Sequence, residues 1–145
     1  MVFELFNDVY KKFKMHFYKE VFKKTMKKGE SLTTVETFCM EVIYALGRPS
    51  ISEFADFTSI SSANAADKVN NLIKKGYINK VQSTEDKRRY YLEVTPKYID
   101  YYNISNSYVE KVMKRMEEAF SEEELKTLEK MLKIIDTELL NDWDE

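Results

Sequence analysis

The sequence has little of what marks a secreted, membrane-spanning or loop-rich protein. Its 145 residues include one cysteine, three glycines and two prolines. One cysteine excludes an intrachain disulfide framework, and so few helix breakers beside abundant Lys, Glu, Leu and Met favour a mainly helical fold. No apolar run approaches membrane-spanning length, and the N-terminus lacks the basic-then-apolar pattern of a secretion signal. We therefore expect a cytoplasmic protein with one domain over residues 1–145.

Residues with catalytic or metal-binding chemistry are equally scarce. His16 is the only histidine, and it has no cysteine or paired carboxylate at metal-ligand spacing. No glycine-rich phosphate loop, nucleophile elbow or acid/base pair is present. Cys39, between Phe38 and Met40, is typical of a buried small side chain rather than a low-pKa redox sensor. These absences predict a protein that is not an enzyme and has no cofactor and no metal.

Charge is unevenly distributed along the chain. The formal net charge is −2 and the pI about 5.6, which argues at first against a nucleic-acid partner. However, the chain from Glu117 onward is acidic, whereas its middle concentrates cations: Lys68, Lys74, Lys75, Lys80, Lys87, Arg88 and Arg89. Because recognition depends on where charge lies more than on its sum, a basic face can coexist with an acidic whole.

The segment from Leu72 to Thr95 is typical of a helix end followed by a hairpin. Gly76 ends a helical pattern whose last turn carries two lysines. Aromatic and β-branched residues then alternate over 77–81 and 90–95, separated by the polar segment 82–89. This pattern predicts a two-stranded hairpin with a charged tip.

The tip of this hairpin carries three consecutive cations, Lys87, Arg88 and Arg89, directly after the acidic residues Glu85 and Asp86. An aspartate can orient a neighbouring guanidinium, and an oriented arginine on a narrow hairpin suits the minor groove of A·T-rich DNA. The alternative is a solvated hairpin tip without a ligand.

Three helices are predicted upstream. The first is capped by Thr33 or Thr34 and runs to about Leu46, with a core stripe formed by Phe38, Val42, Ile43 and Leu46. A short helix follows over about 53–58, capped by Ser50 or Ser52, with Phe54, Ala55 and Phe57 as packing groups. A turn at 59–61 leads to a helix capped by Ser61 or Ser62 that runs to Lys75. Two short helices joined by a tight turn form a helix-turn-helix.

The helix over 62–75 separates into two faces. Its apolar side is predicted to pack inward: Ala65, Ala66, Val69, Leu72 and Ile73. The opposite side is small and polar, so it can seat in a major groove, where asparagines pair with adenine and lysine reaches a guanine edge or a phosphate. The predicted contacts of this helix are Ser61, Ser62, Asn64, Asp67, Lys68, Asn71 and Lys74. An ordinary surface helix is the alternative, and the Asp67 carboxylate repels phosphates unless it is paired.

A helix-turn-helix followed by this hairpin resembles the MarR family of winged-helix transcriptional regulators. The resemblance rests on Leu32 and Thr33, on SISEFADFTSIS at 50–61, on LIKKGYINKV at 72–81, and on Asp86, Lys87 and Arg88 with Leu92, Val94 and Thr95 after them. It implies a mainly α fold with a small β wing, in which residues 32–96 form the DNA-binding lobe and 1–31 and 97–145 form dimerisation helices. It also implies that Arg88 enters the minor groove and that Asp86 orients it. Lys87, Tyr98 and Asp67 depart from the usual family pattern.

Both ends of the chain carry amphipathic patterns that favour pairing. Ser121 and Glu124 read as a capping box, followed by apolar residues at spacings of three and four: Leu125, Leu128, Leu132, Ile135 and Leu139. Near the N-terminus the stripe consists of Phe6, Val9, Phe13 and Phe17. We expect these stripes to form a bundle between two subunits. A monomer that folds both ends onto its own core and a lysine-rich helix lying on a membrane are the alternatives.

The functional prediction is a homodimeric repressor that binds an inverted-repeat operator in double-stranded DNA. By the same resemblance, a small aromatic effector would bind where the wing meets the next helix, near Tyr98, Tyr101 and Tyr102, and release the DNA. The alternative function is a winged-helix module that binds another protein and not DNA.

Overall fold

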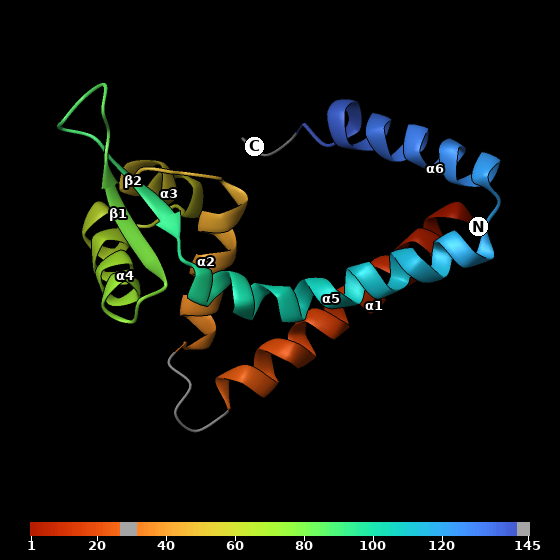
Figure 1. Ribbon diagram of the computed structural model, residues 1–145, viewed down its shortest axis with the longest axis horizontal. Coiled ribbons are helices and arrows are strands. Elements are labelled where there is room, and N and C mark those ends of the chain that lie inside the picture. Colours follow the sequence, from red (N-terminus) through yellow and green to blue (C-terminus); the bar gives the residue numbers. More distant parts are fainter. Residues whose placement is uncertain (27–31, 142–145) are drawn as a thin grey trace. The chain divides into compact units, whose positions relative to one another are not determined.

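A computed structural model describes residues 1–26 and 32–141 of the chain, with the side chains of 101–105 left out. Its elements are α1 (Val2–Thr25), α2 (Thr34–Ala45), α3 (Ile51–Thr58), α4 (Ser62–Lys74), β1 (Ile78–Gln82), β2 (Tyr90–Val94), α5 (Pro96–Ala119), α6 (Glu122–Ile134) and a π-helical turn, η1 (Ile135–Leu139). The predicted fold class, mainly helical with a small hairpin wing, is confirmed (Figure 1).

The chain forms two compact units, Met1–Ser105 and Asn106–Glu145, and α5 begins in the first and ends in the second. The first unit holds the winged lobe, and the second holds α6. The single-domain assignment, with its lobe at 32–96, stays a prediction. No helix within the described ranges is long and apolar enough to cross a bilayer.

Side-chain caps decide where the helices of the lobe begin. The Thr33 hydroxyl accepts from the Glu36 amide at 3.1 Å, and the Glu36 carboxylate accepts from the Thr33 amide at 3.1 Å, which completes a capping box for α2. Ser50 caps α3 and Ser61 caps α4 by the same hydroxyl-to-amide geometry. The structure therefore selects Thr33, Ser50 and Ser61 from the pairs that the sequence left open.

Left-handed residues make the turns between these elements. Ser59 ends α3 with φ of 57° and so lets the chain reverse into α4. Gly76 has φ of 83°, and its amide and that of Tyr77 donate back to the last turn of α4. Only glycine adopts such a φ without strain, so Gly76 is the helix stop that the sequence predicted.

The core of the lobe lies between three helices and the hairpin. Met40 and Ile43 of α2, Phe54 of α3, Val69 and Leu72 of α4, Ile78 of β1 and Leu92 of β2 are fully or almost fully buried. Burial of each such side chain contributes about 1.5–3 kcal/mol. Two side chains that were predicted to pack in the core are instead partly exposed: Phe38 is 44% exposed and Phe57 is 42% exposed.

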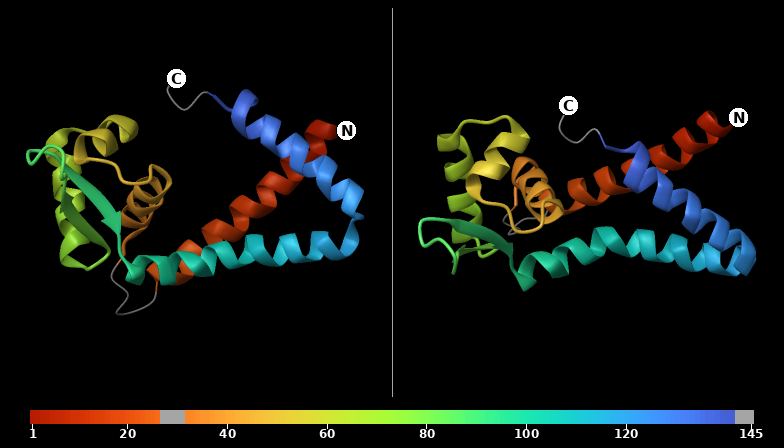
Figure 2. Two further views of the ribbon diagram at one scale, coloured as in Figure 1. Left: turned by 45° about the horizontal axis from the view of Figure 1, so that its top comes forward. Right: turned by 90° about the horizontal axis from the view of Figure 1, so that it is seen from above.

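The hairpin is antiparallel, with Ile78 opposite Val94 and Gln82 opposite Tyr90. The first strand was predicted at 77–81 and lies at 78–82, and the second was predicted at 90–95 and lies at 90–94. Figure 2 shows the hairpin loop extending beyond the helices of the lobe in both further views.

In the second unit, α6 begins with the capping box that the sequence predicted. The Ser121 amide donates to Glu124 at 2.8 Å, and the Ser121 hydroxyl accepts from the Glu124 amide at 3.1 Å. The helix was expected to continue regularly through Leu139, but from Ile135 its hydrogen bonds widen into η1. Such a turn shifts the following side chains around the axis, so the stripe of threes and fours does not run straight to Leu139.

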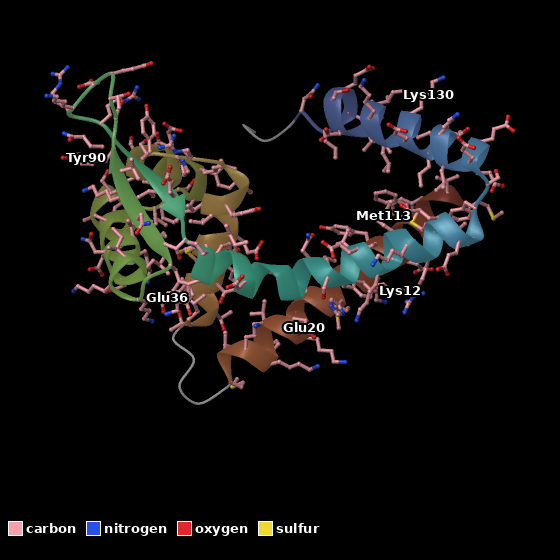
Figure 3. The ribbon with its side chains drawn as sticks, in the orientation of Figure 1. Lys12, Glu20, Glu36, Tyr90, Met113 and Lys130 are labelled. Carbon is pink, nitrogen blue, oxygen red and sulfur yellow. The ribbon has the colours of Figure 1, made fainter. Side chains whose placement is uncertain are left out.

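A partly buried ion pair connects the C-terminal end of α4 to α2. The Lys75 Nζ lies 2.8 Å from Glu36 Oε1, and the side chains of Lys75 and Glu36 are 33% and 9% exposed. Burial acts to raise the pKa of Glu36, but the hydrogen bonds from Lys75 and Thr33 outweigh it and hold that pKa below the ordinary carboxyl value. Figure 3 shows Glu36 near the start of α2.

We predict that Lys75→Met destabilises the fold by about 1–3 kcal/mol at neutral pH, because it leaves the Glu36 carboxylate buried without its cation. The pair's contribution is present above the unfolded carboxyl pKa and is lost as pH falls through the lower, folded-state pKa of Glu36. Urea unfolding at several pH values should therefore show that the difference in unfolding free energy between Lys75→Met and wild type becomes smaller in acid. The control is Lys74→Met, an exposed neighbour; equal effects of the two variants would contradict the role of the pair.

Candidate nucleic-acid interface

Helix α4 presents the two faces that the sequence predicted. Ala65, Val69 and Leu72 are buried, whereas the opposite side is exposed: Ser61, Ser62, Ala63, Asn64, Asp67, Asn71 and Lys74. The exposed face begins with short side chains, which allow close approach of the helix backbone, and carries amides and a cation further along. The Asp67 carboxylate lies on this same face.

Lys68 was expected on the exposed face of α4, but it lies at the edge of that face. Its side chain is half-buried and lines an apolar hollow of about 210 Å³ together with Cys39 of α2 and Phe54 of α3. Burial raises the pKa of the Cys39 thiol, and the nearby Lys68 ammonium only partly opposes this. Lys68 is therefore at the edge of the exposed face of α4, next to the supporting helices.

The wing loop is closed by its own backbone. The Ser83 amide donates to the Arg89 carbonyl at 2.8 Å, and the Arg89 amide donates to the Asp86 carbonyl at 2.9 Å. The Gln82 side-chain amide also donates to the Lys87 carbonyl at 2.7 Å. These bonds define a compact tip, on which the side chains of Lys87, Arg88 and Arg89 are all exposed.

Asp86 accepts two hydrogen bonds from Arg88, one from its backbone and one from its side chain. The Asp86 Oδ1 accepts from the Arg88 backbone amide at 3.0 Å and from the Arg88 Nε at 3.3 Å. These two bonds, with a smaller effect of the Arg89 charge, keep the pKa of Asp86 below its ordinary value. The Arg88 side chain is still 91% exposed, so its guanidinium is oriented at one edge and available to a ligand at the other.

Hydrogen bonds to two backbone carbonyls fix the base of the wing to the helices. The Leu92 amide donates to the Pro49 carbonyl at 2.8 Å, and the Thr95 hydroxyl donates to the Gly76 carbonyl at 2.7 Å. Arg48 adds an ion pair to Glu93 at 2.9 Å and lies over the Tyr91 ring. The start of α3 and the end of α4 are thus both attached to the wing, which holds the two exposed faces in one arrangement (Figure 1).

A hollow of about 290 Å³ lies between the start of α3 and the wing, and sequence reasoning did not identify it. It is lined by Ser50, Ile51, Ser52, Lys80, Arg88, Arg89 and Tyr90. The sequence did mark Lys80 as one of the middle cations, but nothing local indicates that residues 50–52 lie beside residues 80–90. Within the described ranges no cluster of His, Cys, Asp or Glu could hold a metal ion.

The predicted effector residues are only partly described. Tyr98 is fully buried, its hydroxyl donates to Glu41 at 3.1 Å, and its ring packs against Tyr44. Burial raises the pKa of Glu41, an effect that the Tyr98 hydrogen bond opposes. The side chains of Tyr101 and Tyr102 lie outside the described residues, so the effector pocket stays a prediction.

The predicted dimerisation residues differ in exposure. Phe6 and Val9 of α1 are 61% and 54% exposed, whereas Phe13 and Phe17 are half-buried, and the Phe17 ring lies 6.4 Å from that of Phe38. On the C-terminal stripe, the half-buried residues are Leu125, Leu128 and Ile135, and the exposed ones are Leu132 and Leu139.

Solved structures with the same fold cover nearly the whole chain. FabT of Streptococcus pneumoniae, solved in complex with DNA, is 20% identical with a TM-score of 0.60 over 95% of this chain and 94% of its own. A mutant of MepR from S. aureus, bound to an oligodeoxyribonucleotide, is 16% identical with a TM-score of 0.55 over 96% of this chain and 98% of its own. A MarR-like transcriptional regulator of Thermotoga maritima is 21% identical with a TM-score of 0.58 over 96% of both chains.

At this level of identity the likeness establishes the fold. None of the curated proteins matches the chain in sequence. The MarR family itself matches residues 32–90, which span α2 to the start of β2 and include the recognition helix and the wing tip. The winged-helix lobe thus matches the MarR family over residues 32–90, and the chain shares the fold of the solved MarR-like regulator.

Proposed function

We propose that the protein reads an inverted-repeat operator as a homodimer, with α4 in the major groove and the wing in the neighbouring minor groove. In each subunit Asn64 and Asn71 pair with base edges, Lys74 and Arg89 contact phosphates, and Arg88 reads groove width. The proteins of like fold solved with DNA support this assignment.

The single observation that carries the proposal is the bond of Arg88 to Asp86. A free arginine loses rotamer entropy when it enters a narrow groove, whereas the Arg88 guanidinium already donates one hydrogen bond, from Nε to Asp86 Oδ1 at 3.3 Å. The bond from the Arg88 backbone amide to the same oxygen fixes the position of the carboxylate. The exposed guanidinium edge of Arg88 is then available to the negative potential of an A·T-rich minor groove.

The exposed face of α4 supports the major-groove contacts. Asn64 and Asn71 are both exposed and lie seven positions apart, which is about two helical turns. Asp67 lies between them, where it accepts from a cytosine amino group or repels a phosphate. Lys68 is assigned a phosphate contact at the rim of the interface, since its stem lines the hollow behind α4.

Exposed apolar side chains support dimerisation. Phe6 and Val9 in the first unit, and Leu132 and Leu139 in the second, are all more than a third exposed. Large apolar groups left on a helix surface favour burial against a partner. A second copy of the chain meets this need and places two α4 helices about 34 Å apart, one turn of DNA.

A bound dimer on an operator blocks access of polymerase, so repression is the proposed outcome, in the cytoplasm where the DNA lies. A small aromatic effector bound near Tyr98, Tyr101 and Tyr102 would change the spacing of the two α4 helices and release DNA by population shift. The half-buried Glu41, whose pKa burial raises, gives this region a carboxyl group that a phenol could engage.

We predict that Arg88→Ala weakens binding to all duplexes, whereas Asn71→Ala relaxes preference at particular base pairs by about 1–3 kcal/mol each. The measurement is affinity for duplexes selected from a random library and for single-base variants of them. Wild-type affinity should also fall by orders of magnitude from about 50 to 200 mM salt. Identical effects of the two substitutions would contradict the division of roles, and a flat salt response would favour the protein-binding alternative.

We predict that Leu132→Glu shifts the protein from dimer to monomer and lowers operator affinity with it, because a carboxylate cannot be buried in an apolar contact without a partner. Sedimentation equilibrium over a range of protein concentrations gives the association constant. The matched control is Lys133→Glu, an exposed polar neighbour on the same helix. A monomeric wild-type protein would refute the dimer.

For the effector, we predict that phenols which weaken operator binding also raise Tm, since a ligand that binds the folded state stabilises it. Thermal unfolding with increasing phenol concentration, beside the variant Tyr98→Phe, tests this. An effector that derepresses in cells without any change in Tm of the purified protein would count against the pocket.

A further inference from the structure

The hollow between the start of α3 and the wing carries positive charge without a compensating carboxylate in its lining. Among the described residues that line it, Lys80, Arg88 and Arg89 are cations, and the others are Ser50, Ile51, Ser52 and Tyr90. The Asp86 carboxylate lies outside this lining, where it bonds to Arg88 and interacts more weakly with the charge of Arg89. Lys80 is a cation of the lining that this carboxylate does not bond to.

The register of the hairpin places Lys80 there. Lys80 lies opposite Leu92, and Tyr90 is two positions further along β2, so the three side chains share one face of the sheet. Leu92 is buried in the core, but Lys80 and Tyr90 are exposed. This face of the sheet therefore extends beyond the core. There Lys80 and Tyr90 lie beside the start of α3 as well as being exposed to solvent.

Two contacts hold the walls of the hollow in place. The Leu92 amide donates to the Pro49 carbonyl at 2.8 Å, which aligns residues 49–52 with β2. The Lys80 ammonium lies 4.8 Å from the centre of the Tyr90 ring, a cation–π contact that limits the positions of this long side chain. Figure 3 shows Tyr90 at the end of the lobe nearest the wing loop.

From this arrangement we propose that the hollow binds a phosphate group, and that the group is a backbone phosphodiester of DNA, with Lys80 as a contact residue. The site rests on the proposed function and extends it. The hollow has a volume of about 290 Å³, which is enough to admit a phosphate group between its cations. A phosphate here lies between the groove entered by α4 and the groove entered by Arg88, and so fixes the register of both on the duplex.

The first test compares salt dependence in Lys80→Ala and wild type. The probe is a fluorescein-labelled A·T-rich duplex of about 30 base pairs, on the order of three helical turns. Loss of one phosphate contact should reduce the slope of log affinity against log salt by about 0.9 for each subunit bound. The ratio of wild-type to variant affinity then shrinks about 3.5-fold for each subunit between about 50 and 200 mM salt.

Two further variants serve as controls on the same strand. Lys80→Arg keeps the charge and should keep the slope. Asn79→Ala alters the neighbouring residue, whose side chain lies on the other face of the sheet, and should also leave the slope unchanged. An unchanged slope in Lys80→Ala, with a steep slope in wild type, overturns the phosphate site and leaves the proposed function intact. A flat slope in wild type overturns the proposed function itself.

The second test places a negative charge in the hollow. Ser52→Glu should lower DNA affinity at least tenfold at low salt. It should not lower Tm, because an acidic residue in the first turn of a helix is favourable. Thr34→Glu adds the same charge to the first turn of α2 and is the matched control. Equal DNA affinity of the two variants overturns the proposal.

A third measurement distinguishes DNA from free phosphate as the source of the group. Inorganic phosphate at millimolar concentration should leave the Tm of wild type and of Lys80→Ala equally unchanged. A rise in Tm for wild type that Lys80→Ala abolishes, together with an unchanged salt slope, would assign the site to a free phosphate and overturn the backbone contact.

Discussion

The hydrogen bond from the Leu92 amide to the Pro49 carbonyl is the constraint on which the arrangement of the lobe depends. It joins the return strand of the wing to the segment between α2 and α3, which are otherwise separated by more than 40 residues of chain. With the Thr95 bond to Gly76 at the end of α4, it fixes the wing at two points. A wing attached at a single point would swing relative to α4, and a two-groove interface requires that it does not.

The lobe is therefore a rigid support for two kinds of exposed side chain. The amides on α4 and the guanidinium of Arg88 belong to elements that pack on a shared core, in which Leu72, Ile78 and Leu92 are almost completely buried. Because that core is small, each of these side chains is a large fraction of the few kcal/mol by which a domain of this size is stable. The Glu36 to Lys75 pair then adds a direct connection between α2 and the end of α4.

Much of this could be predicted from the sequence, because the signals are local. Capping residues at Ser50, Ser61 and Ser121, the glycine stop at Gly76 and the Asp86 to Arg88 spacing all act within a few positions of the chain. Contacts between residues that are far apart in the chain could not be predicted from the sequence. Phe38 was assigned to the core from its periodicity, yet its ring remains 44% exposed and meets Phe17 of another helix. The hollow at Lys80 depends on the pairing of β2 with residue 49, which no local pattern encodes.

The buried thiol of Cys39 has a consequence for how the lobe responds to oxidants. Burial raises its pKa, so at neutral pH it is held as the protonated thiol, while peroxides react with the thiolate. The Cys39 side chain lines the apolar hollow beside Lys68, so a small oxidant that enters this hollow meets a thiol rather than a thiolate. Cys39 is therefore expected to be a slow target for peroxide, and its place in α2 is explained by packing in the core of the lobe.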